Sequence, residues 1–83
     1  MNREDILATV VKHLVEAVDD LDPAEVDPAK SMKDLGANSL DIVEVVSRTM
    51  RELKIKIPRS ELARLTNVGE LVDMLYEVGT TSA

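Results

Sequence analysis

The chain has 83 residues, enough for one small domain with a single core. It contains no cysteine, which excludes a disulfide framework, a thiolate metal site and a thiol nucleophile. The net charge is −6, and all of it lies in residues 1–41, which hold ten acids and four bases, whereas residues 42–83 hold six of each. An acidic surface argues against nucleic-acid binding and favours basic protein partners. The alternative is that the acidic residues only keep the domain soluble.

The first predicted element is a helix over about residues 3–18, in which apolar residues recur at helical spacing. The stretch is charged from its first residues and has no long apolar run, so it is neither a signal peptide nor a membrane span. We therefore expect a cytoplasmic protein without membrane contact. The apolar stripe comprises Ile6, Leu7, Val10, Val11, Leu14, Val15 and Val18.

A long loop follows, because two Asp-Pro pairs and Gly36 interrupt any helix over residues 19–37. The acids of this loop do not have the spacing of a calcium-binding loop, and we expect no metal site. Apolar residues are scattered through it, which predicts a loop that packs against the core rather than a disordered linker. These anchors are Leu21, Val26, Met32 and Leu35.

The second predicted helix starts at Asn38 or Ser39, both favoured N-cap residues, and runs to about Leu53. Residues 40–53 place apolar side chains on two sides of this helix. Either both sides are buried in a central helix, or the second side is a docking surface. The side expected to face the core comprises Ile42, Val45, Val46, Thr49 and Leu53. The other side comprises Leu40, Val43, Ser47 and Met50, bordered by Glu44 and Arg51.

The rest of the chain predicts an extended stretch ended by Pro58, one or two helical turns over residues 60–65 capped by Ser60, and a last helix. Asn67 and Glu70 have capping-box spacing at its start, and Gly79 is expected to end it.

The fold class is therefore all-α: a small four-helix bundle with three longer helices, one short helix and a long loop between the first two. We expect a single domain over residues 1–79 and a flexible tail over residues 80–83.

The sequence does not contain the groups that an enzyme needs. His13, the one histidine, falls on the flank of the first helix stripe, where a surface or half-buried structural histidine is expected rather than a general base. Gly36 stands alone, so no glycine-rich phosphate loop is present. We expect neither catalysis nor a bound metal.

The segments "DLGANSLDIVEVV", "KIKIP" and "TNVGELVDML" resemble those of an acyl carrier protein, over nearly the whole chain. The family's signature is Asp-Ser-Leu preceded by Leu-Gly, and here Asn38-Ser39-Leu40 follows Leu35-Gly36. The resemblance implies that Ser39 receives 4′-phosphopantetheine from coenzyme A through a phosphopantetheinyl transferase. The arm's thiol would hold acyl groups as thioesters. The free N–H groups of a helix start suit its phosphate, and small Gly36 and Ala37 would leave room for the transferase.

The resemblance also implies that the second helix is the main recognition element. We expect a monomer, because no second unexplained apolar face lies outside this helix. A ketosynthase, an acyltransferase or an enzyme resembling HMG-CoA synthase would dock on the second helix, with Glu44 as the acid that meets a basic partner. The residues expected at this surface are Asn38, Leu40, Asp41, Val43, Glu44, Ser47, Met50 and Arg51.

Two departures from the family pattern refine the expectation. Asn38 replaces the signature aspartate and removes a charge beside the arm, while Arg48, Arg51 and four later bases make the surface mixed in charge. The mixed surface argues against a role in fatty-acid synthesis.

The segments "GANSLD", "TMREL" and "IPRSELA" are similar to those of the discrete carriers of polyketide synthases that accompany β-branching enzymes. This resemblance implies that the chain presents an acetyl unit to an HMG-CoA-synthase-like enzyme. The alternatives are a fatty-acid or peptidyl carrier, or an unmodified helical adaptor.

Overall fold

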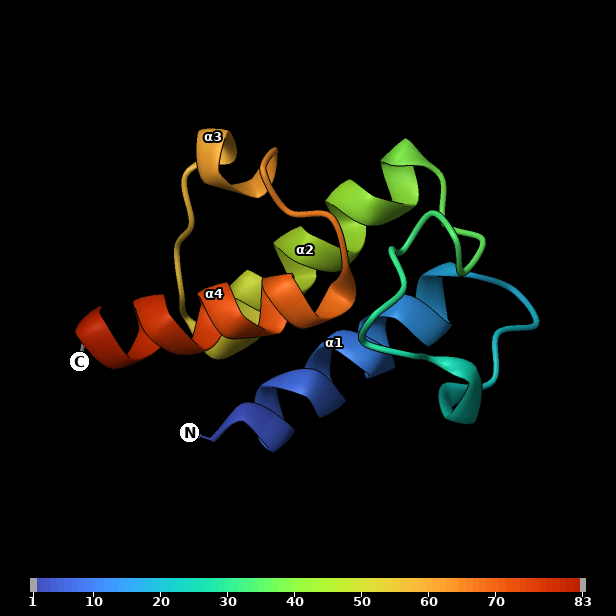
Figure 1. The fold of residues 1–83 in the computed structure, drawn as a ribbon, viewed down its shortest axis with the longest axis horizontal. Helices are drawn as coiled ribbons and strands as arrows, with labels where there is room; N and C mark the ends of the chain where they lie inside the picture. Colours follow the sequence, from blue (N-terminus) through green and yellow to red (C-terminus); the bar gives the residue numbers. More distant parts are fainter. Residues whose placement is uncertain (1, 83) are drawn as a thin grey trace.

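The computed structural model describes residues 2–82, and the described part of the chain is a bundle of helices without strands (Figure 1). This confirms the predicted all-α fold with three long helices and one short one. No helix in this part is both long enough and apolar enough to cross a membrane. The elements are α1 (Arg3–Ala17), the 3₁₀ turn η1 (Pro23–Glu25), α2 (Ser39–Leu53), α3 (Arg59–Leu62) and α4 (Val68–Ser82).

Helix α1 packs against both α2 and α4, which lie beside it in Figure 1. It begins after Asn2, whose side-chain oxygen accepts a hydrogen bond from the Asp5 N–H at 2.8 Å. Its predicted apolar stripe supplies the core, since Ile6, Val10 and Leu14 are buried. The expected helix thus forms, and it ends within one residue of the predicted position.

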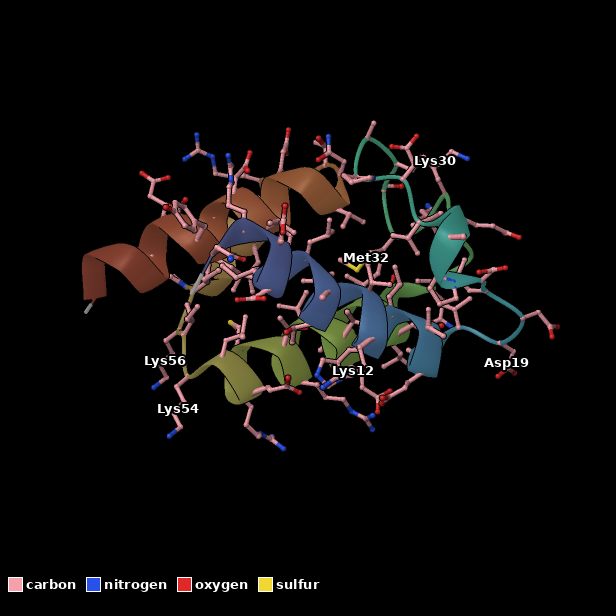
Figure 2. The ribbon with its side chains drawn as sticks, turned by 90° about the horizontal axis from the view of Figure 1, so that it is seen from below. Lys12, Asp19, Lys30, Met32, Lys54 and Lys56 are labelled. Carbon is pink, nitrogen blue, oxygen red and sulfur yellow. The ribbon has the colours of Figure 1, made fainter. Side chains whose placement is uncertain are left out.

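The long loop packs down as predicted, because its apolar anchors contact the buried residues. Figure 2 shows Met32 pointing in between the helices, whereas Asp19 points outward. The loop is also tied to the start of α4, where the Val68 N–H donates to the Lys30 carbonyl at 3.0 Å and the Gly69 N–H donates to the Pro28 carbonyl at 2.8 Å. Two of the N–H groups that a helix start leaves free are thereby satisfied by the loop.

Helix α4 differs from the prediction at its end. It continues through Gly79 to Ser82, so the expected helix end at Gly79 is wrong. A Cβ at Gly79 would lie 2.9 Å from Cδ1 of Ile55, which shows that this glycine makes room for a side chain of another segment. Ala83, the last residue of the expected tail, lies outside the described residues, and the flexibility of residues 80–83 stays a prediction.

Helix α3 is shorter than predicted and begins one residue earlier. The Pro58 carbonyl accepts hydrogen bonds from the N–H groups of Glu61 and Leu62, at 3.0 and 3.2 Å. Ser60 therefore lies inside the helix and is not its cap, which corrects the prediction. Residues 63 and 64 continue as a turn, and residues 55–58 have no regular secondary structure.

His13 is more buried than its position on the stripe's flank suggested. Its Nε2 lies 3.0 Å from Oε1 of Glu52, the same oxygen to which Lys12 Nζ donates at 2.7 Å. The hydrogen bond from Lys12 holds the pKa of the Glu52 carboxyl below its ordinary value, and His13 acts in the same direction. The histidine therefore links α1 to the end of α2, which is a structural role.

Thr49 provides a test of the core. Its side chain is fully buried under α1, and its Oγ1 has no hydrogen-bond partner among the described residues. Replacing it by valine removes an unpaired polar atom, so we expect Thr49→Val to raise the free energy of unfolding by about 1 kcal/mol in urea titrations. Thr49→Ser keeps the hydroxyl and loses the methyl group, and it should destabilise. A Thr49→Val variant less stable than the wild type would contradict this packing.

Candidate functional site

The start of α2 is fixed by a capping box between Asn38 and Asp41. The Asp41 N–H donates to Oδ1 of Asn38 at 2.8 Å, and the Asn38 N–H donates to Oδ2 of Asp41 at 3.2 Å. Both side chains therefore satisfy backbone groups that a helix start would otherwise leave unpaired. Of the predicted partner residues, these two thus have a defined role inside the chain.

Ser39 is the first residue of α2, and its side chain is exposed. The capping box uses the N–H of Asp41, whereas the N–H groups of Ser39 and Leu40 have no acceptor among the described residues. These two donors and the positive end of the helix dipole surround the Ser39 hydroxyl. The position therefore fits a phosphate esterified to Ser39, as the phosphopantetheine arm requires.

The turn before Ser39 uses its two small residues differently from the prediction. Gly36 has a φ of +103°, which side-chain-bearing residues rarely adopt, so glycine is required by the backbone. Ala37 is buried against Leu14, Val18 and Val45, and its N–H donates to the Met32 carbonyl at 3.0 Å. Ala37 therefore anchors the turn in the core, and the room for a transferase stays a prediction.

The outer side of α2 presents apolar side chains next to Ser39. Leu40 is 81% exposed and Val43 is 59% exposed, while Ser47 is exposed as well. Val45 and Thr49 on the opposite side are fully buried. The prediction that α2 has one core-facing side and one free side is therefore confirmed, except that Met50 is half-buried and packs against the core.

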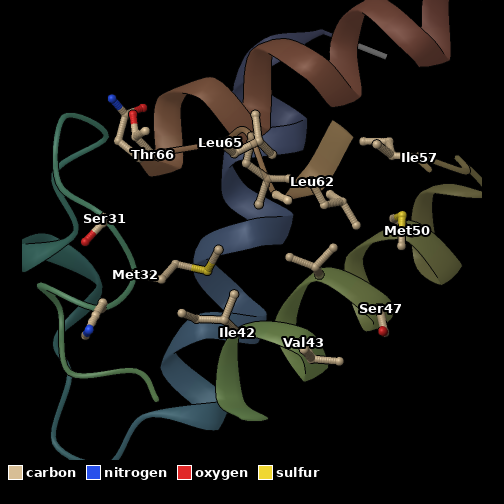
Figure 3. A pocket seen from close by; sticks show the side chains of 15 residues that line it. Ser31, Met32, Ile42, Val43, Ser47, Met50, Ile57, Leu62, Leu65 and Thr66 are labelled. Carbon is tan, nitrogen blue, oxygen red and sulfur yellow. The ribbon is translucent and has the colours of Figure 1, made fainter. Parts of the chain in front are cut away.

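A cavity of about 750 Å³ opens beside this outer side, between α2, α3 and the loop before α2 (Figure 3). Its lining is largely apolar, so it can take up hydrocarbon but offers little to a charged group. Sequence reasoning missed it, although Met32 had been singled out as a loop anchor. Lining residues labelled in Figure 3 are Ser31, Met32, Ile42, Val43, Ser47, Met50, Ile57, Leu62, Leu65 and Thr66.

The histidine of the described chain does not lie at Ser39. His13 lies on α1, where it contacts Glu52 at the opposite end of α2 from Ser39. Within residues 2–82 there is no group of three or more histidine, aspartate or glutamate side chains that could hold a metal ion.

Comparison with known proteins agrees with this geometry. The family described as "Phosphopantetheine attachment site" matches residues 9–75. A polyketide biosynthesis acyl-carrier-protein of Bacillus subtilis is 32% identical over 77 residues, covering 93% of this chain and 94% of that protein. An acyl carrier protein of Helicobacter pylori is 39% identical over 75 residues, covering 89% of this chain and 90% of that protein.

A solved structure is also similar. A chain in the crystal structure of the curacin biosynthetic pathway HMG synthase in complex with acetyl donor-ACP superimposes with a TM-score of 0.79 at 35% sequence identity. The superposition covers 89% of this chain and 95% of that chain. The similarity therefore includes the amino-acid sequence as well as the arrangement of the helices.

The capping box can be tested directly. Asn38→Ala removes the acceptor of the Asp41 N–H, so the free energy of unfolding should fall by about 1 kcal/mol in urea titrations. Asn38→Asp keeps a capping oxygen and should change stability by only a few tenths of that amount, which makes it the matched control. An alanine variant as stable as the wild type would mean that the box does not hold the start of α2.

Proposed function

This chain belongs to the acyl carrier protein family, and from this premise we propose that it is the acyl carrier of a polyketide pathway, with its 4′-phosphopantetheine arm on Ser39. The arm is the family's cofactor, attached by a phosphodiester. Members of this family carry substrates and are not catalysts.

One observation supports Ser39 above all. It is an exposed hydroxyl at the first position of a capped long helix, beside two N–H groups without acceptors. Of the other described serines, Ser31 donates its N–H to Asp34 and accepts from the Asp34 N–H, and it lies in the loop. Ser47 lies in the middle of α2, Ser60 within four-residue α3 and Ser82 at the end of α4, so none of them is at the start of a long helix.

The arm supplies a thiol, absent from the chain itself, on which acyl groups are held as thioesters. The residues of the chain hold and present the arm. Asn38 and Asp41 fix the start of α2, and Ala37 anchors the preceding turn in the core. The attachment point is therefore rigid while the arm is flexible, and the tether raises the local concentration of cargo at a docked enzyme.

A polyketide pathway is favoured by the relative from Bacillus subtilis, named for polyketide biosynthesis, which matches over 94% of its own length. The solved neighbour is an acetyl donor carrier in complex with an HMG synthase. We extend the proposal accordingly: this chain presents an acetyl unit to an HMG-CoA-synthase-like enzyme. Such a partner would contact exposed Leu40 and Val43 beside Ser39, with Glu44 at their edge.

Intact mass spectrometry tests the attachment site. We expect the purified chain, incubated with coenzyme A and a broad-specificity phosphopantetheinyl transferase, to gain the mass of one phosphopantetheine. Ser39→Ala should gain nothing and remain folded by circular dichroism, because alanine tolerates a helix start. Ser47→Ala is the matched control, since it removes an exposed α2 hydroxyl and should load like the wild type.

The same experiment separates the alternatives. Loading of Ser39→Ala, or no loading of a folded wild-type chain by several transferases, would contradict the carrier proposal and leave an unmodified adaptor. With a loaded chain, an acetyl group on the arm should be transferred to an HMG-CoA-synthase-like enzyme of a polyketide pathway. Efficient elongation of malonyl units by a fatty-acid ketosynthase, with no such acetyl transfer, would favour a fatty-acid carrier instead.

A further inference from the structure

We infer that the far end of α2 is a second docking site, which binds an acidic segment containing an apolar side chain on a partner enzyme. The site, here called the basic groove, consists of Ser47, Met50, Arg51, Lys54, Ile55 and Lys56. The inference rests on the proposed carrier function for the identity of the partner, but the binding chemistry stands on the groove alone.

The cations of the basic groove are not used by the fold. Arg51, Lys54 and Lys56 are exposed, and none has an ion-pair partner among residues 2–82. The adjacent acid, Glu52, is turned toward α1, where Lys12 and His13 occupy its carboxylate. In a chain of net charge −6, this leaves a local excess of three positive charges. Figure 2 shows Lys54 and Lys56 pointing away from the bundle together.

The backbone explains these side chains only in part. The helix dipole favours a cation at Arg51, in the last turn, but Lys56 lies beyond the helix. Lys54 is the C-cap residue and has a φ of 57°, a left-handed conformation that glycine adopts at lower cost. A lysine at this position works against the local backbone preference, and its ammonium group has no ion-pair partner among residues 2–82.

The basic groove also has an apolar floor. It is an open hollow of about 410 Å³, and Met50 and Ile55 at its base are half-buried. A phosphate or another small anion would leave this floor uncovered. A short acidic segment with one apolar residue would cover the floor and bring carboxylates to the three cations, which is the complementarity expected of a protein partner.

The charges along α2 therefore have opposite signs at its two ends. Asp41 and Glu44 lie in the first two turns of α2, while Lys54 at its C-cap is 15 residues after Ser39, or about 22 Å along the helix axis. A partner that fits has a basic surface at its active-site entrance and an acidic one farther along. An enzyme with a uniformly basic docking surface would be repelled at the groove, so the groove selects among partners.

A peptide probe tests the basic groove on the unmodified chain. The probe is a short peptide, acetylated and amidated at its ends, with a central leucine between pairs of glutamates. In a titration followed by amide proton–nitrogen spectra, we expect shifts confined to residues 47–56. Replacing the leucine by glycine should weaken binding if the floor is used. Inorganic phosphate is the second probe, and equal localised shifts with phosphate would overturn the assignment to an acidic segment.

Two matched variants complete the experiment. Lys54→Gly with Lys56→Gln removes two charges and relieves the left-handed lysine, so the chain should stay as stable as the wild type while its affinity for the peptide falls about tenfold at low salt. Lys30→Gln with Lys33→Gln makes the same charge change in the long loop and should bind like the wild type. Absence of localised shifts, or equal losses in both variants, would overturn the inference.

The peptide titration and the mass assay test the basic groove and the carrier function separately. Both double variants should still gain one phosphopantetheine in the mass assay, because neither alters Ser39 or its capping box. Normal loading without peptide binding would overturn the basic groove alone. Peptide binding to a chain that cannot be loaded would instead overturn the carrier function and leave the groove in place.

Discussion

The register of α2 against the core, together with the position at which this helix begins, is the constraint on which the site depends. Each residue of a helix is rotated by about 100° from its neighbour, so the register that buries Val45 and Thr49 places Leu40 and Val43 on the outer side. The capping box of Asn38 and Asp41 and the buried Ala37 fix that start. Ser39 is therefore exposed at the end of the helix, beside free N–H groups, and the core between α1 and α2 stays buried.

Much of the fold could be predicted from the sequence because local patterns determine it. The stripes of α1 and α2 have helical period, and the Asn-Ser pair at residues 38 and 39 marks a helix start. The predictions are wrong where a segment distant in the sequence determines the local structure. Gly79 was predicted to end α4, but it accommodates Ile55, a residue 24 positions earlier in the chain. Ser60 was predicted to cap α3, but the carbonyl of Pro58 starts that helix.

The residues of the site also fall into two groups, those placed by spacing along one helix and those placed by distant segments. Ser39 and the outer side of α2 were predictable because they lie on one helix, whose spacing places them. The cavity beside them was not, because Met32, Leu62 and Leu65 reach it from separate segments. Nor could the sequence distinguish paired from unpaired cations: Arg48 contacts Glu16 and Glu44, whereas Arg51, one turn later, has no such partner within residues 2–82. The basic groove emerges only from that difference.

The most direct measurement of the central claim compares the amide spectra of the chain before and after loading with phosphopantetheine. If the phosphate sits at the start of α2, the largest changes will fall on the N–H groups of Ser39 and Leu40, for which residues 2–82 provide no acceptor. Amides of the core, such as those of Val10 and Leu75, should stay unchanged. Largest changes at another serine, or changes spread over the core, would contradict the account.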